Sequence, residues 1–539
     1  MDRLSLELLE TILSCPVLSD RDVLNFSSTC HYFREIVQTS RVIWKQRFYN
    51  KWPNLPKDLG CPDWYFDELK YFHSLKTRVL DELKLMHESF FKDLNMLYSN
   101  GMKWKVLSYE KERSNCYIRT LLLDVINTKE AINSIVAVPF NTPGNLTLQF
   151  SARFILRLLN EHYLKNTWDK FKRLPSQEQT LEKIAIFFAQ WFHLDIQDVD
   201  NHVAKRLNDI ANLVKVRLRS TNPKHPIFTS EVCEWRKKLE KHQWGPENCH
   251  EVISTIREVL YSHLGLQGNY SWHPSPEFSF INKVLERRIG LPIVLAVIYE
   301  SVARRLGVVV EPINYPNHFL LKFQLNQTFY IDTCNGCFID GVTPCFHQIP
   351  VFGETQYSAA TTDEIVRRMA NNLKFAIGHG DVTERIIHLR LLNRLVTFVG
   401  FPLDGDMVTE LLPYYTVPEN HNRKRTTYLK YAVGMIMIDE NSATKCVICD
   451  WKGPTHRNNK QPKYLVVFEN GVTKFVLQDG ITPTTDPGNL QSVEQVGLCF
   501  SHFFKNHFVP NEQMENLFPS DAQVRHRFYH EMQLRNYRP

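Results

Sequence analysis

The sequence has no long hydrophobic run and no secretory leader. Its most apolar stretch, residues 289–299, is interrupted by Gly290 and Pro292 and is too short to span a bilayer. The first residues include acidic side chains and no apolar segment of the length that a signal peptide needs. We therefore expect no membrane segment and a soluble protein of the cytoplasm, the nucleus or both.

The sequence also lacks a strong net charge and a compact cysteine framework. The net charge is +6 over 539 residues, which by itself indicates neither a nucleic acid nor a membrane surface as partner. The twelve cysteines are scattered along the chain, which fits reduced thiols better than disulfides. Hydrophobic residues make up 43% and charged residues 23%, so packed cores are expected. The length predicts roughly three to four domains.

Residues 4–44 predict three short helices that are apolar on more than one face. So small a segment buries too little surface to be stable alone, and a helix that is apolar nearly all round needs a second surface to cover it. That surface is either the rest of a larger helical core, which is the simpler interpretation, or a partner protein.

The pattern of these residues resembles an F-box, with Ser5 where the family usually has proline and Trp44 packing the module. The resemblance implies docking to the Skp adaptor of a cullin–RING ubiquitin ligase through apolar residues of the first two helices. The predicted Skp-binding residues are Leu4, Leu6, Leu8, Leu9, Ile12, Leu13, Val23 and Leu24.

The centre of the chain carries the arrangement of a cysteine-type acyl-transfer site. Pro292 suits a first helical position, and the following residues are apolar at helical spacing. Two segments with strand patterns then carry His318 and Asp332. However, Pro292, Ile293 and Val294 at the helix start have no nucleophilic atom, so the base and the orienting acid lack the group they would activate.

This region, residues 177–349, resembles the SirB family of transglutaminase-like domains. The matching segments are Gly268-Asn269, Phe280-x-Asn282, Arg287 to Ile293, Ala303 to Gly307, Pro316-x-His318 to Leu321, and Ile331-Asp332. Active transglutaminase-like enzymes place a cysteine at the helix start, where the helix dipole lowers the pKa of the thiol. The resemblance therefore implies a domain without catalysis, in which His318 and Asp332 are relics.

Two other chemistries stay open at this point. Cys334 or Cys337, close to Asp332, offers a thiol that approaches His318 from another side. The pairs Cys334-x-x-Cys337 and Cys446-x-x-Cys449 have zinc-ligand spacing. The second pair lies in a strand pattern that puts its two cysteines on opposite faces. We expect no metal and no cofactor.

Strand patterns dominate from Tyr431 onward, and Asn470-Gly471 predicts a tight hairpin. The segments Val433-Gly434, Val447-Ile448-x-x-Trp451 and Gln461-Pro462-x-Tyr464 resemble the YccV/HspQ-like small β-barrel, whose bacterial relatives are linked to hemimethylated DNA. From Tyr431 to Pro510, seven Lys/Arg balance seven Asp/Glu. A neutral domain lacks the positive field that phosphate binding needs, so we expect protein recognition rather than nucleic-acid binding. The basic stretch Asn422 to Arg425 is interpreted as a solvated linker, with a nuclear signal as the alternative.

Taken together, the patterns predict an α+β multidomain protein. The expected parts are an F-box (1–50), a mainly helical connector (51–176), the SirB-like domain (177–349), a helical linker region (350–428), the YccV/HspQ-like barrel (429–512) and a C-terminal tail (513–539). The predicted function is a substrate-recognition subunit of a Skp–cullin–F-box ubiquitin ligase that catalyses nothing itself and binds protein targets of unknown identity. The alternatives are a thiol-dependent acyl-transfer enzyme and an adaptor for DNA or chromatin.

Overall fold

The structure is a computed structural model of the chain. It describes residues 4–52, 64–92, 112–194, 198–229, 239–269, 275–315, 318–340, 358–378, 382–400, 423–453 and 461–536. These residues form two compact units, one from residues 1–159 together with 413–539 and the other from residues 160–412. Within the described ranges, no helix is both long and apolar enough to cross a membrane. The predicted α+β class is confirmed, since the N-terminal part is helical, the centre mixes helices with a sheet, and the C-terminal part holds small sheets.

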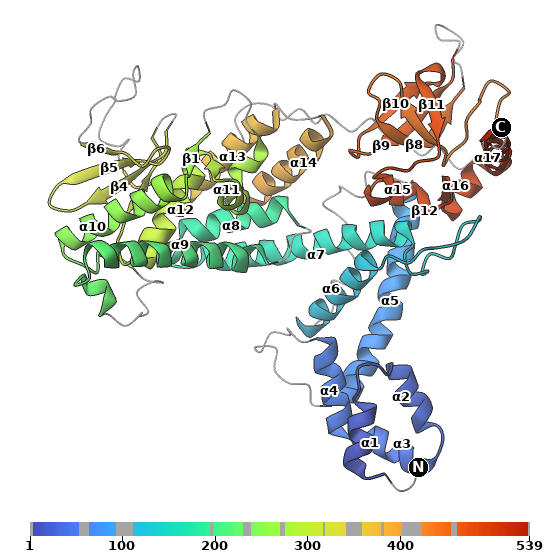
Figure 1. Cartoon of the computed structure of the whole chain (residues 1–539), viewed down its shortest axis with the longest axis horizontal. Coiled ribbons are helices and arrows are strands. Elements are labelled where there is room, and N and C mark those ends of the chain that lie inside the picture. The colour runs from blue at the N-terminus through green and yellow to red at the C-terminus, as the bar shows by residue number, and fades with distance from the viewer. Residues whose placement is uncertain are drawn as a thin grey trace. The chain divides into compact units, whose positions relative to one another are not determined.

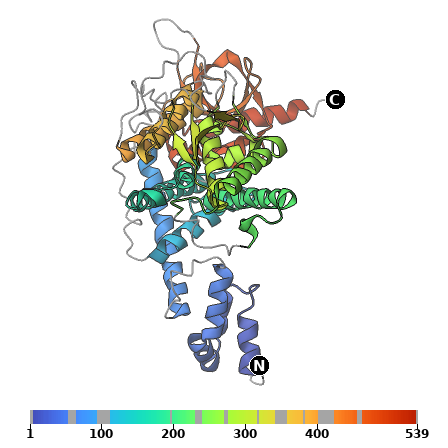
Figure 2. The ribbon, with the colours of Figure 1, turned by 90° about the vertical axis from the view of Figure 1, so that its left-hand side faces the viewer.

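The N-terminal part of the first unit consists of helices (Figure 1). They are α1 (Leu6–Leu13), α2 (Asp20–Ser27), α3 (His31–Thr39), α4 (Arg41–Lys51), α5 (Tyr65–Lys92), α6 (Glu112–Asn127) and α7 (Leu146–Lys172), of which α7 continues into the second unit. Figure 2 shows the blue helices α1 to α4 gathered at the N-terminus. A single apolar core joins them to α5, α6 and the start of α7, and it includes Trp44, Trp52, Phe72, Tyr117 and Leu148. The segments predicted as F-box and connector therefore share one core.

Local signals start the first helices. The Ser5 hydroxyl accepts a hydrogen bond from the Leu8 amide at the beginning of α1. At α2, Ser19 and Asp22 form a reciprocal capping box, which satisfies two amides that a helix start leaves without partners. Ser5 thus begins α1 as an N-cap in place of the proline that F-box sequences usually have there.

The C-terminal part of the first unit is built on two antiparallel sheets. Their strands are β7 (Ile436–Asp439), β8 (Lys445–Lys452), β9 (Lys463–Phe468), β10 (Thr473–Leu477), β11 (Ile481–Thr484), β12 (Phe500–Phe504) and β13 (His507–Pro510). The five-stranded sheet has the order β10-β9-β8-β7-β11, and β12 pairs with β13. A 3-10 turn at Gln478–Gly480 carries the chain from one edge strand of the larger sheet to the other. The predicted hairpin is present between β9 and β10, with Gly471 at φ +80°.

The segment expected as a C-terminal tail belongs to this same fold, which corrects the prediction for residues 513–539. It forms α16 (Glu512–Leu517) and α17 (Asp521–Asn536), while α15 (Val496–Cys499) precedes β12. Leu517, Phe518 and Tyr529 are buried with the sheet in one apolar core. The sequence of α17 is largely polar, and its few apolar residues form no clear helical pattern. The sequence therefore did not predict that this helix packs on the sheet.

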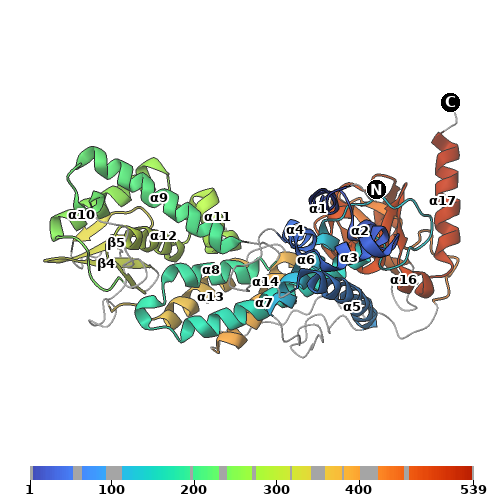
Figure 3. The same ribbon diagram turned by 90° about the horizontal axis from the view of Figure 1, so that it is seen from below.

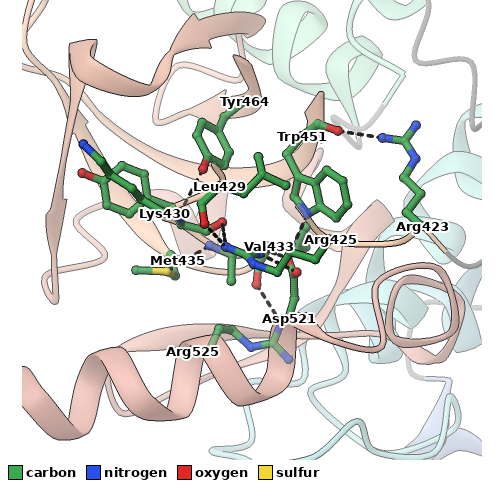
Figure 4. Close-up of polar contacts among 12 residues, drawn as sticks. Arg423, Arg425, Leu429, Lys430, Val433, Met435, Trp451, Tyr464, Asp521 and Arg525 are labelled. Atoms are coloured by element: carbon green, nitrogen blue, oxygen red, sulfur yellow. Dashed lines mark hydrogen bonds and ion pairs between the residues drawn. The ribbon is translucent and has the colours of Figure 1, made fainter. Parts of the chain in front are cut away.

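A buried carboxylate ties α17 to the sheet (Figure 4). Asp521 is fully buried and accepts hydrogen bonds from the Val433 amide at 2.7 Å, from Trp451 Nε1 at 3.0 Å and from Arg425 Nη1 at 2.7 Å. Arg425 also donates to the Leu429 and Tyr431 carbonyl oxygens. The stretch predicted as a solvated basic linker therefore holds the domain together; Asn422 lies outside the described residues.

The second unit surrounds one buried helix with other helices and a small sheet (Figure 3). Its helices up to that point are α8 (Leu181–Phe192), α9 (Val199–Thr221), α10 (Pro246–Arg257), the π-helix Glu258–His263, α11 (Ile281–Arg287) and the central α12 (Pro292–Arg305). Its strands are β1 (Gln267–Gly268), β2 (Ile289–Gly290), β3 (Glu311–Ile313), β4 (Leu320–Gln324), β5 (Thr328–Asp332) and β6 (Phe338–Asp340). Every residue from Ile293 to Ala303 is buried, because α8, α9, α10 and β4 pack around α12.

The region expected as a helical linker instead completes this core. It contains α13 (Thr362–Gly378) and α14 (Val382–Val399), whereas residues 401–422 lie outside the described ranges. Val366, Leu373, Leu392 and Leu395 are fully buried in the core that contains α12. A helix with one apolar stripe needs a surface to cover it, and here that surface is the central domain.

Candidate functional site

The eight residues predicted to bind the Skp adaptor divide into two groups. Leu9, Leu13 and Val23 point inward and are at most 3% exposed, so they stabilise the chain rather than offering a surface. The other five lie on the outside of α1 and α2 or, for Leu4, just before α1, and each is between 36% and 52% exposed. These five residues are Leu4, Leu6, Leu8, Ile12 and Leu24. We call them the N-terminal apolar face.

A cluster of exposed apolar side chains of this kind marks an interaction surface more often than chance exposure does. Leu8 and Ile12 are four residues apart and therefore neighbours on one side of α1. Two further exposed residues, Val17 at 89% and Tyr32 at 51%, lie in the same helical segment and were not among the predicted residues. Val17 sits in the connection between two helices, where helical periodicity gives no information.

An arginine and an aspartate, which the sequence pattern did not single out, hold the N-terminal apolar face in shape. Arg47 on α4 donates from Nε to Asp20 at 2.7 Å, and from its terminal nitrogens to the Leu18 and Leu13 carbonyl oxygens at 2.8 and 3.1 Å. Its side chain is 7% exposed. Because Asp20 begins α2 and Leu13 ends α1, one guanidinium fixes the relative position of three helices. Trp44 adds a hydrogen bond from its indole to the Val37 carbonyl oxygen at 2.6 Å.

Asp20 gives these helices a defined acid sensitivity. A hydrogen bond from His73 and the adjacent Arg47 guanidinium lower the pKa of Asp20 to about 2, although burial opposes the shift. A carboxylate with a lowered folded-state pKa stabilises the fold above its ordinary pKa, and this stabilisation is lost as the pH falls toward the lowered value. We therefore expect Asp20→Asn to weaken the N-terminal helices at pH 4 to 7 and to match the wild type near pH 2.

Hydrogen exchange of the amides of residues 6–51 in the full-length chain, compared between variant and wild type at each pH over that range, checks this expectation. Asp67→Asn is the matched control, because Asp67 is exposed on α5 and forms an exposed ion pair with Lys70. A constant difference between Asp20→Asn and wild type down to pH 2 would contradict the role given to Asp20.

The central site lies where the start of α12 meets the ends of β4 and β5. Leu320 on β4 pairs with Asp332 on β5, so the antiparallel register brings His318, two residues before Leu320, to the end of the sheet that carries Asp332. Burial lowers the pKa of His318, and the negative charge of Asp332 opposes that shift. The predicted base and acid are therefore close enough to interact electrostatically. Pro316 and Asn317 lie outside the described residues.

The contacts of Asp332 are those of a structural carboxylate. One of its oxygens accepts a hydrogen bond from the Cys334 amide at 2.9 Å, and its own amide donates to the Cys337 carbonyl oxygen at 2.9 Å. The next residue, Thr333, places its hydroxyl 2.9 Å from the Pro292 carbonyl oxygen and 3.0 Å from the Phe319 carbonyl oxygen. Asp332 thus closes the turn after β5, and Thr333 ties that turn to the first residue of α12.

The start of α12 holds no nucleophile. Its first three residues are Pro292, Ile293 and Val294, and the side chains of the last two are buried. Cys334 is 5% exposed and packs against Gly268, where an added Cβ would lie 2.9 Å from its sulfur atom. A thiol buried in this way behaves as a small apolar side chain, whereas a reactive cysteine needs access to solvent and substrate. The other thiol considered, Cys337, is exposed. Within the described ranges, no three His, Cys, Asp or Glu side chains are grouped to hold a metal ion.

Comparisons with known proteins find relatives of this region and of the whole chain. Residues 201–371 match the profile of the transglutaminase-like superfamily. F-box only protein 21 of Pongo abelii is 24% identical to this chain, in an alignment that covers 96% of the chain and 91% of the relative. Its counterpart in Homo sapiens is 23% identical over the same shares. The chain is similar along its length to F-box only protein 21.

A shorter match and a search of solved structures complete the comparisons. A UPF0162 protein of Xylella fastidiosa is 38% identical over 85 residues, which are 16% of this chain and 30% of that protein. No solved structure matches the chain. An F-box, a SirB-like domain and a YccV/HspQ-like barrel in this order predict a resemblance to F-box only protein 21, which is confirmed, and the chain contains a transglutaminase-like domain at its centre.

Proposed function

We propose that this chain is the substrate-recognition subunit of a Skp–cullin–F-box ubiquitin ligase. The observation that carries the proposal is the outward-facing half of the two first helices. Leu8 and Ile12 are about half exposed although their neighbours Leu9 and Leu13 are buried. An apolar face that its own chain leaves uncovered is stabilised when a partner buries it, at about 25 cal/mol for each Å² of apolar surface. The partner is the Skp adaptor, which links the chain to the cullin and its RING subunit.

In this proposal the chain catalyses no reaction itself. The transglutaminase-like domain has a histidine and an aspartate in range of each other but Pro292, Ile293 and Val294 where the attacking atom belongs. Without a nucleophile, a base and an orienting acid cannot open the covalent route of acyl transfer. The central domain and the C-terminal sheet instead bind the protein that is to be ubiquitinated.

Reconstitution with purified components tests the proposal. We expect the full-length chain and the Skp adaptor to elute together in size-exclusion chromatography and, with the cullin added, to form a larger complex. Separate elution of the chain and the adaptor would contradict it. Proximity labelling in cells with the wild type beside an F-box variant then identifies targets as proteins that are labelled by both and accumulate only with the variant.

A further inference from the structure

Strand β10 leaves one of its sides without a partner strand. It lies at the edge of the five-stranded sheet and pairs only with β9. The hydrogen bonds at the two ends of this pairing join the Phe468 amide to the Val472 carbonyl oxygen and the Gln478 amide to the Pro462 carbonyl oxygen. Because hydrogen-bonded pairs alternate along an antiparallel ladder, the main-chain groups of Phe475 and Leu477 point away from β9. Within the described ranges, no backbone group pairs on that side with the two polar main-chain groups of Phe475 or with the Leu477 amide, whereas the Leu477 carbonyl begins the 3-10 turn Gln478–Gly480.

The same two residues expose apolar side chains next to two lysines. Phe475 is 36% exposed and Leu477 is 42% exposed. The register places Lys452, Lys463 and Leu477 in one row across β8, β9 and β10, so two like charges lie directly opposite each other on this face. Such a pair is destabilising unless an anion lies between or beside the two charges. Among the described residues, neither lysine forms an ion pair, although the charge of Lys452 acts on the buried Asp450.

The opposite edge of the sheet is protected, and this contrast indicates that the open edge is specific to β10. Strand β11 is four residues long and carries Pro483, which has no amide hydrogen to offer to another strand. Short strands and proline are common means of preventing edge-to-edge pairing. The lysine ammonium groups do not block β10 in the same way, since that of Lys452 lies over the Phe475 ring, 4.6 Å from its centroid.

We propose that β10 receives an extended acidic segment of the target protein as a sixth, antiparallel strand of this sheet. The inference rests on the proposed function, because it assigns target binding to this domain. Its main chain would bond to Phe475 and Leu477, as in recognition by strand addition. An apolar side chain of the segment covers Phe475, and a carboxylate beside Leu477 reaches Lys463 and relieves the repulsion between the two lysines. The antiparallel direction follows the other pairs of the sheet.

A designed peptide probes this edge without knowledge of the natural target. The peptide has eight residues in the repeat valine–threonine–glutamate–threonine, so that one face of its strand presents valine and glutamate in turn. Its valine and glutamate amides face β10 in an antiparallel pair. A second peptide is N-methylated at these residues, a third is N-methylated at the threonines as the matched control, and a fourth has lysine for glutamate.

Two variants of the full-length chain separate strand addition from simple apolar contact. Leu477 has φ −76° and ψ 149°, which proline adopts readily, and its amide is not used by β9. Leu477→Pro therefore removes the outward donor without breaking the sheet, whereas Leu477→Ala removes the side chain and keeps the donor.

The expected results are specific. The valine–glutamate peptide and its threonine-methylated control bind the wild type in fluorescence anisotropy, and the other two peptides bind about tenfold more weakly or not at all. Leu477→Pro weakens binding about tenfold, and Leu477→Ala weakens it less. In hydrogen exchange, the peptide slows the amides of Phe475 and Leu477 and leaves those of Lys474 and Val476 unchanged.

Three results would overturn the inference. The first is no binding of the valine–glutamate peptide to the wild type. The second is equal binding of the two N-methylated peptides. The third is an equal loss of peptide affinity in the two Leu477 variants. Leu477→Pro should still bind the Skp adaptor. If the wild type binds the peptide but not the adaptor, the ligase proposal fails and the strand addition stands. If it binds the adaptor but not the peptide, only the strand addition is rejected.

Discussion

A chain that carries both Leu8→Asp and Ile12→Asp is expected to fold normally and to lose the Skp adaptor. Both side chains are about half exposed, so the changes remove little from the apolar core of α1 to α7. In the complex, however, each new carboxylate would be buried without a partner. Central interface residues contribute about 2 kcal/mol or more each, so the pair should weaken binding by roughly a thousandfold. Isothermal titration with the purified adaptor measures this change.

Two further variants separate lost binding from lost folding. Val216→Asp changes an apolar residue that is 70% exposed on α9, far along the chain from the F-box segment, and it should leave adaptor affinity unchanged. Leu9→Ala removes a buried side chain of α1 and should lower the free energy of unfolding by about 2–5 kcal/mol. Normal adaptor affinity in the Leu8→Asp, Ile12→Asp chain would count decisively against the N-terminal apolar face as the docking surface.

Local sequence patterns predicted the elements better than they predicted what each element contacts. The apolar residues of α1 indicate a helix, but they lie on all its sides. Periodicity alone therefore could not show that Leu8 is exposed and Leu9 is buried. The contacts of α1 with α4 decide which side is buried, and α4 begins 28 residues after α1 ends. The eight residues predicted as one binding set are therefore part core and part surface.

Charged residues with distant partners were the hardest to assign. Arg425 lies in a basic run that reads as solvated, yet its partner Asp521 follows 96 residues later. No local pattern connects two positions so far apart. Strict alternation also failed in β8, where the register shifts between Ile448 and Asp450 and leaves Cys449 as an extra residue. Cys446 and Cys449 are both buried, as are the residues between them, because this strand is covered on both faces.

More of the central site could be predicted from the sequence, because its residues lie on two strands that are neighbours in the sheet. Short connections between β4 and β5 make the antiparallel pairing of Leu320 with Asp332 the simplest outcome, and this pairing brings His318 toward Asp332. The role of Thr333 could not be read in advance, since its hydroxyl acts on the carbonyl oxygen of Pro292, 41 residues earlier. The sequence thus indicated that His318 and Asp332 lie close together, but not the hydrogen bonds of Asp332 and Thr333.

Asp521→Ala is expected to be the most destabilising single change in the C-terminal domain. It would leave Arg425 buried without its counter-ion, and it would also deprive the Val433 amide and the Trp451 indole of their acceptor. Removing one partner of a buried ion pair lowers the free energy of unfolding by about 3–5 kcal/mol. The effect should change little with salt, because a buried pair is screened far less than a surface pair. Urea unfolding of the full-length chain, followed by hydrogen exchange of α17 and the sheet, measures it.

Matched variants assign this loss to its cause. Asp521→Asn keeps an acceptor oxygen at the same place, so it should lower the free energy of unfolding less than Asp521→Ala does. Glu512→Ala, at an exposed position of α16, should change the free energy of unfolding little. Arg425→Met replaces the buried charge with an apolar chain, so combining it with Asp521→Ala should cost less than the sum of the two single changes. Additive losses would show that Arg425 and Asp521 act independently. Arg525 on α17 donates to the Val433 carbonyl oxygen at 2.8 Å. In Asp521→Ala, α17 should therefore keep this hydrogen bond, and its amides near residue 521 should exchange faster than those near Arg525.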